Sequence, residues 1–99
     1  MDLTELTEKM HVFVDAKGWY EPDSPRPQTA RNLAASLAIE AAEVLTLFQW
    51  TDQEPLPEDL AMELADVTLY LLQLASVSDV NLEKAVLDKL AVNYERHWE

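Results

Sequence analysis

Two pairs of acidic residues have the types and the spacing to do chemistry in this chain. Glu40 and Glu43 form the first pair, and Glu63 and Asp66 repeat the three-residue spacing further along the sequence. Side chains three residues apart on a helix project from one face, about 5–6 Å apart at Cβ. Desolvating two like charges is costly unless a cation joins them. Each pair therefore either faces solvent or holds a cation.

The first pair is unusual because Glu40 interrupts an apolar stripe. Residues 32–50 have helical periodicity, and Glu40 falls on the face formed by Leu33, Leu37, Val44 and Leu47. A solvated acidic face is the alternative interpretation, and a single Glu-x-x-Glu motif favours it. Two such motifs on adjacent helices make a metal site as good an interpretation as the solvated face.

If the helices that carry the pairs pack antiparallel, all four carboxylates can come together. We expect one helix over residues 29–50 and another over residues 58–78, joined by a short segment of helix breakers. Four converging acids demand divalent cations, and an all-oxygen ligand set suits magnesium or manganese. His11 and His97 are not part of this arrangement and are expected at the surface.

Local signals divide the chain into four helices and predict an all-α fold. The first helix covers residues 2–17 and stops at Gly18, and a proline-rich loop follows it. Pro57 suits the first turn of the third helix, and Asn81 can cap the fourth. We expect a single domain over residues 1–99, built as an antiparallel four-helix bundle.

The third helix is apolar on more than one side, which predicts a second contact surface. One stripe consists of Leu60, Leu64, Val67, Leu71 and Leu74, and other faces carry Met62, Leu69, Leu72 and Val77. A helix that is apolar on several sides is buried on several sides. We therefore expect homo-oligomerisation to complete the bundle, and we expect Tyr94 and Trp98 to pack against a neighbour.

Composition argues against several classes of function. The formal charge of −12 disfavours duplex nucleic acid as a partner, although an anionic ligand that brings its own metal ions is compatible with it. The chain has no cysteine, which favours a reducing, cytoplasmic compartment. The N-terminal residues are acidic and no apolar run reaches membrane-spanning length, so neither a signal peptide nor a membrane partner is expected.

Basic and aromatic side chains could complete a nucleotide site. Lys89, Asn93 and Arg96 lie along one line of the fourth helix, where they could meet phosphates. A solvated helix end with favourable cations is an equally good interpretation of that line. A nucleobase stacks well on aromatic rings, and three of them are candidates: Trp19, Trp50 and Tyr70. Each ring could instead fill the core or an interface.

Taken together, the motifs over residues 13–96 closely resemble those of the MazG-like nucleotide pyrophosphohydrolases. The similar segments are Ser36-Leu-Ala-Ile-Glu-Ala-Ala-Glu-Val-Leu, Leu47-Phe-Gln-Trp, Glu63-Leu-Ala-Asp-Val-Thr-Leu-Tyr-Leu-Leu, Leu82-Glu-Lys-Ala-Val, and Lys89 with Asn93. The resemblance implies hydrolysis of a nucleoside triphosphate to the monophosphate and pyrophosphate. It also implies that the magnesium ligands and catalytic carboxylates are Glu40, Glu43, Glu63 and Asp66.

The same resemblance implies a set of substrate contacts and an assembly. Phosphate or sugar would be contacted by Arg31, Lys89, Asn93 and Arg96, and the nucleotide pocket would consist of Trp19, Asn32, Trp50 and Tyr70, as in relatives that act on dCTP. Family members are homodimers or homotetramers, and the implied role is nucleotide-pool housecleaning with a preference for deoxynucleoside triphosphates.

The chain departs from those relatives at two places, both near the expected base pocket. The relatives carry a histidine in the first helix where Met10 aligns, with His11 one place away, and their following loop is shorter than residues 21–30. Two other functions also fit the sequence. One is a non-enzymatic helical adaptor that dimerises, and the other is a phosphoribosyl-ATP pyrophosphohydrolase.

Overall fold

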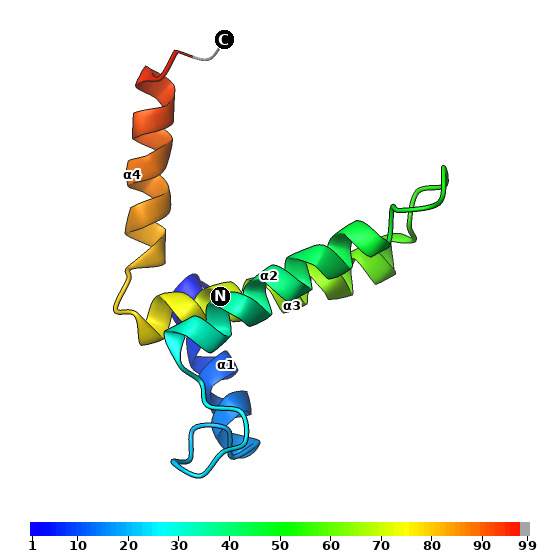
Figure 1. Cartoon of the computed structure of the whole chain (residues 1–99). Coiled ribbons are helices and arrows are strands. Elements are labelled where there is room, and N and C mark those ends of the chain that lie inside the picture. Colours follow the sequence, from blue (N-terminus) through cyan, green and yellow to red (C-terminus); the bar gives the residue numbers. More distant parts are fainter. Residues whose placement is uncertain (98–99) are drawn as a thin grey trace.

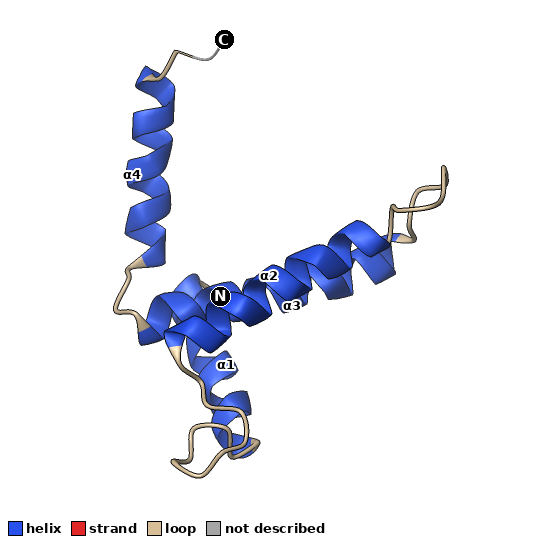
Figure 2. Ribbon diagram, in the orientation of Figure 1, coloured by secondary structure: helices blue, strands red, loops and turns tan. Residues whose placement is uncertain are grey.

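Four α-helices and the loops between them make up residues 1–97, the part of the chain that the computed structural model describes (Figure 1, Figure 2). The helices are α1 (Leu3–Ala16), α2 (Ala30–Thr46), α3 (Pro57–Val77) and α4 (Leu82–Glu95). No strand occurs in these residues, so the all-α prediction is confirmed. Trp98, for which the sequence predicts packing against a neighbour, lies outside the described residues.

Short-range capping chemistry sets three of the helix starts. The side chains of Asp2, Thr29 and Asn81 each accept a hydrogen bond from the backbone N–H three residues further on, at 2.9, 3.2 and 3.0 Å. Each bond satisfies a donor that a helix N-terminus otherwise leaves without a partner. At the other end of α1, Gly18 adopts a φ of 74°, the left-handed conformation that glycine reaches without strain.

α2 ends at Thr46, earlier than the predicted end at Trp50. The Thr46 hydroxyl donates to the carbonyl of Glu43 at 2.6 Å, and the Leu47 N–H bonds to the carbonyl of Val44 instead of continuing the helical ladder. Such side-chain bonds compete with helix propagation. The chain then turns, and Trp50 has a φ of 72°, which a non-glycine residue rarely adopts.

α2 and α3 form a long antiparallel hairpin, and α1 crosses α3 near its C-terminal half (Figure 1). The side chains buried where these three helices meet are Met10, Val14, Leu33, Leu72 and Gln73. Burying an aliphatic side chain of this size contributes roughly 1.5–3 kcal/mol relative to leaving it in water. This small core therefore fixes how the hairpin and α1 pack together.

α4 departs from the predicted bundle, because it projects away from the hairpin instead of packing along it (Figure 1). α3 ends in a tight turn in which Asp79 has a φ of 56° and the Val80 N–H bonds to the carbonyl of Ala75. α1 covers this end of α3, and the first residues of α4, Leu82 and Glu83, share a cavity with α1 before the rest of α4 projects away. The prediction that one chain closes an antiparallel four-helix bundle is therefore wrong for the chain on its own.

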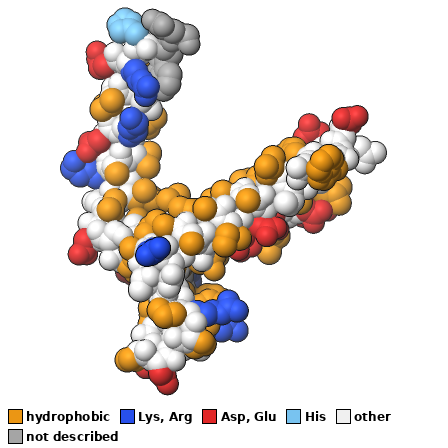
Figure 3. Space-filling view, viewed as in Figure 1, with side chains coloured by type: hydrophobic (Ala, Val, Ile, Leu, Met, Phe, Trp, Pro, Cys, Tyr) orange, Lys and Arg blue, Asp and Glu red, His pale blue; other side chains and the backbone are white. Residues whose placement is uncertain are grey.

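Apolar side chains remain on the surface of the hairpin and of α4 (Figure 3). Examples with at least half of their area exposed are Ile39, Met62, Leu87, Leu90 and Val92. By length and composition α3 could cross a membrane, and 11% of its apolar window is buried. This corrects the expectation that no apolar run reaches membrane-spanning length. α3 nevertheless carries two acidic residues, Glu63 and Asp66, in its first half.

Candidate metal centre and adjoining cavity

Three acidic side chains converge on the α2–α3 hairpin. Glu40 comes from α2, and Glu63 and Asp66 come from α3; one carboxylate oxygen of each lies within 4.8 Å of the others. Glu40 and Glu63 are partly buried, whereas Asp66 is exposed. Antiparallel packing of the two helices places the two acidic motifs opposite each other, as their spacing predicts. We call these three residues the acidic cluster.

Repulsion within the acidic cluster affects Glu40 most. Partial burial raises the pKa of Glu40 above its ordinary value, and the negative charges of Asp66, Glu63 and Glu43 raise it further, in that order. No described Lys or Arg forms an ion pair with the cluster, since the ion pair found in the described residues joins Lys84 to Asp88 on α4.

An all-oxygen donor set without a protein counter-charge fits a hard divalent cation, which would lie between the carboxylates and neutralise them. The residues present therefore fit magnesium or manganese. Glu43 lies one helical turn beyond Glu40 and is not part of the acidic cluster, although its negative charge still raises the pKa of Glu40. The structure thus brings together three of the four expected ligands.

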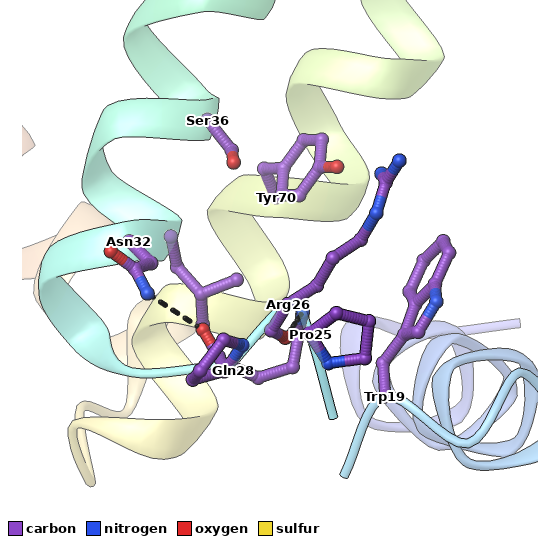
Figure 4. A pocket seen from close by; sticks show the side chains of 9 residues that line it. Trp19, Pro25, Arg26, Gln28, Asn32, Ser36 and Tyr70 are labelled. Atoms are coloured by element: carbon purple, nitrogen blue, oxygen red, sulfur yellow. Dashed lines mark hydrogen bonds between the residues drawn. The ribbon is translucent and has the colours of Figure 1, made fainter. Parts of the chain in front are cut away.

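A cavity of about 310 Å³ adjoins the acidic cluster (Figure 4). Its walls include three residues that the sequence assigns to substrate binding, Trp19, Asn32 and Tyr70. Three further polar side chains on its walls have no assignment from the sequence: Arg26, Gln28 and Ser36. The cavity therefore combines aromatic faces with hydrogen-bonding groups, as a site for a small polar ligand requires.

The cavity and the acidic cluster are one helical turn apart on both helices. Ser36 precedes Glu40 by four residues on α2, and Tyr70 follows Asp66 by four residues on α3. Residues at that spacing are neighbours on one helix face. The acidic groups nearest to a ligand in the cavity are therefore those of the acidic cluster.

A chain of hydrogen bonds ties the proline-rich loop to α1 and α3. His11 contacts the hydroxyls of Tyr20 and Ser76 through its two ring nitrogens, at 2.6 and 2.7 Å. The amide nitrogen of Gln73, which is 2% exposed, donates to the Tyr20 hydroxyl at 3.2 Å and to the Gln28 side-chain oxygen at 2.7 Å. Burial raises the pKa of Tyr20, which keeps its hydroxyl protonated in this network.

His11 is therefore a structural residue of the loop anchor, and the prediction that it lies free at the surface is wrong. His97 is exposed, as predicted. Met10, where the resemblance implies a histidine in the relatives, is buried and lines a separate apolar cavity of about 250 Å³ together with Trp19 and Tyr70. Neither Met10 nor His11 reaches the cavity beside the acidic cluster.

Several predicted substrate residues lie elsewhere in the single chain. Trp50 is 91% exposed beyond the end of α2, and the helix alone extends about 15 Å from Ser36 to Thr46 by helical rise. Arg31 is exposed and does not line the cavity. The remaining three belong to α4 or to its C-cap, which project away from the site: Lys89, Asn93 and the C-cap residue Arg96. The chain by itself therefore does not bring these five residues to the acidic cluster.

Comparisons with known proteins agree on one family. No protein-family model matches the chain. Over 103 aligned positions it is 37% identical to dCTP pyrophosphatase 1 of Homo sapiens and 35% identical to dCTP pyrophosphatase 1 of Mus musculus. Each alignment covers 94% of this chain, which spans 58% of the length of either relative. The crystal structure of a pyrophosphatase from Archaeoglobus fulgidus matches with a TM-score of 0.76 and 32% identity, covering 97% of this chain and 92% of that one.

The acidic cluster makes a prediction about stability without metal. Because the pKa of Glu40 is raised in the folded protein, the folded state holds more protons than the unfolded state just above the ordinary pKa of 4.5. Stability is therefore lost as pH rises through that window. Glu40→Gln removes the charge, so in chelator at pH 7 it should melt at a higher temperature than the wild type, and the difference should vanish near pH 4.

Glu58→Gln is the matched control, because Glu58 is exposed on α3 outside the acidic cluster and its replacement changes the net charge equally. Melting curves of the three proteins at both pH values make the comparison. A Glu40→Gln protein that is less stable than the wild type at pH 7 contradicts the repulsion.

Proposed function

The chain belongs to the MazG-like all-α nucleoside triphosphate pyrophosphatases, and we propose that it hydrolyses a deoxynucleoside triphosphate to the monophosphate and pyrophosphate. The relatives from Homo sapiens and Mus musculus are dCTP pyrophosphatases, so dCTP is the first candidate substrate. The chain spans only part of their length, and the proposal therefore rests on its own site.

The observation that carries the proposal is the single-turn separation between the aromatic cavity and the acidic cluster. A nucleotide has the same division, with a flat base and sugar at one end and charged phosphates at the other. Trp19 and Tyr70 offer rings against which a base can stack. Asn32 and Ser36 offer hydrogen bonds to the sugar or base.

Magnesium would be held by Glu40, Glu63 and Asp66, where it would neutralise the phosphates and lower the pKa of a bound water. Glu43 lies one turn from Glu40 and is not part of the acidic cluster, so its carboxylate is available to accept a proton during hydrolysis. Glu40 would stabilise the ion by its charge, and its raised pKa means that it holds a proton more readily when no metal is bound.

We further propose that two copies of the chain assemble, so that α4 of one copy covers the hairpin of the other. The apolar side chains exposed on both elements need a partner. Charge favours this pairing, because Lys89 on α4 and Arg96 at its C-cap complement the acidic cluster on the hairpin. A lipid partner would have to bury Glu63 and Asp66, which is expensive.

The activity is tested by incubating the protein with each common deoxynucleoside and ribonucleoside triphosphate plus magnesium and identifying the products. Pyrophosphate and a monophosphate, with dCTP among the good substrates, are expected. Chelator should stop turnover, and Glu63→Gln should lower kcat by at least about a hundredfold, because mutation of even an outer-shell partner of a metal ligand costs roughly 10–100-fold. Glu58→Gln should keep wild-type activity, since Glu58 lies outside the acidic cluster.

Products other than these exclude the proposed reaction. Hydrolysis of phosphoribosyl-ATP with no turnover of common triphosphates would assign the sister activity. A folded protein that hydrolyses neither phosphoribosyl-ATP nor any common triphosphate, and whose melting temperature does not change with magnesium, would instead be a helical adaptor.

The assembly is tested by light scattering at micromolar concentration. The chain mass is 11.3 kDa, and the expected particle has at least twice that mass. Replacing the exposed Leu87 and Leu90 of α4 with Gln should shift the population toward monomer, because these side chains would lie in the interface. The control is Val12→Gln, because Val12 is an exposed residue of α1 outside the proposed interface. This change should leave the proportion of monomer as in the wild type. A wild-type monomer at all concentrations overturns the assembly.

A further inference from the structure

Among the described residues, Arg26 is the positively charged side chain that lines the cavity beside the acidic cluster. Its guanidinium carbon lies 5.6 Å from the centre of the Trp19 ring, and its side chain extends between Trp19 and Tyr70 (Figure 4). Within the described residues the guanidinium forms no ion pair and no hydrogen bond. An exposed contact between a cation and an aromatic ring is weak, so an anion can displace it readily.

The backbone of Arg26 is held, although its guanidinium is unpaired. The Arg26 N–H donates to the Ser24 hydroxyl at 3.0 Å, and the Arg26 carbonyl accepts from the Gln28 amide at 2.7 Å. The Gln28 side-chain oxygen in turn accepts from the buried Gln73 at 2.7 Å. These bonds connect Arg26 to the core, so the start of its side chain is fixed at the cavity wall while its charged end can reorient.

We propose that Arg26 binds the phosphates of the substrate, an inference that rests on the proposed function. The chain has a formal charge of −12, so a triphosphate meets repulsion over most of the surface. Metal ions at the acidic cluster would draw the phosphates to one end of the cavity. A guanidinium at the cavity wall can then bind phosphate oxygens in bidentate geometry, which an ammonium group cannot match.

Arg26 reaches the cavity from the loop between α1 and α2. The three prolines around it limit the conformations of the loop, and the network through Gln28 and Gln73 anchors it. The loop therefore supplies a charge that no described helix residue brings to the cavity.

The test measures the Kd of the protein for a deoxycytidine triphosphate analogue in the presence of magnesium. The α,β bridge of the analogue is an imido group, which resists hydrolysis. Arg26→Met should raise the Kd at least about tenfold, because a hydrogen bond to a charged group is lost. Arg26→Lys should recover part of the affinity. Deoxycytidine, which has no phosphate, should bind both variants as it binds the wild type.

Lys17→Met is the matched control, because Lys17 also lies over an aromatic ring, 5.7 Å from the centre of Phe13, but does not line the cavity. It should leave the Kd of the analogue unchanged. Gln28→Leu keeps the guanidinium and removes its anchor, so it should weaken analogue binding less than Arg26→Met. Melting temperatures of all variants exclude unfolding as the cause.

Two results would overturn the proposal. One is wild-type affinity of Arg26→Met for the analogue, and the other is an equal loss of affinity for deoxycytidine, which would make Arg26 part of the base pocket. Failure of the proposed function alone would give a different result. The wild type would bind the analogue with an affinity that depends on Arg26, yet it would release no pyrophosphate from dCTP. A wild type that does not bind the analogue at all overturns both.

Discussion

Antiparallel packing of α2 against α3 brings like charges together on the hairpin, and their mutual repulsion opposes that packing. Glu40, Glu63 and Asp66 converge because two helices with apolar stripes pack antiparallel, and no described cation neutralises them. Burial and charge together raise the pKa of Glu40, so the hairpin holds an arrangement that costs stability in the absence of a ligand. Such local cost is typical of functional sites, where a bound ion offsets it.

The remaining elements give this charged site a shape. α1 and the proline-rich loop close one side of the hairpin, and the loop is tied to α1 and α3 through His11, Tyr20 and Gln73. The cavity formed in this way has aromatic walls and ends one helical turn from the acidic cluster. A ligand with a flat group and a charged group therefore finds both environments at a fixed separation, which is how a small scaffold can align a nucleotide for hydrolysis.

Much of this architecture can be predicted from the sequence, because it depends on short-range patterns. Helix caps, apolar stripes and the paired acids are periodic signals, and they locate the four helices and three of the four carboxylates. Features that depend on tertiary bonds cannot be predicted in this way. α2 ends at Thr46 and Trp50 is exposed, His11 bonds to Tyr20 and Ser76, and α4 projects away from the hairpin. Arg26 gives no periodic signal because it lies in a loop.

Binding of a divalent cation to the acidic cluster can be measured by titration with Mn²⁺, followed by electron paramagnetic resonance, because the signal of the free ion disappears on binding. The wild type should bind Mn²⁺ at the acidic cluster, and magnesium should compete for the same site. Asp66→Asn should lose that binding, whereas Asp59→Asn, which changes an exposed acid of α3 outside the cluster, should keep it. Absence of Mn²⁺ binding in the wild type, or equal binding in both variants, would contradict the account.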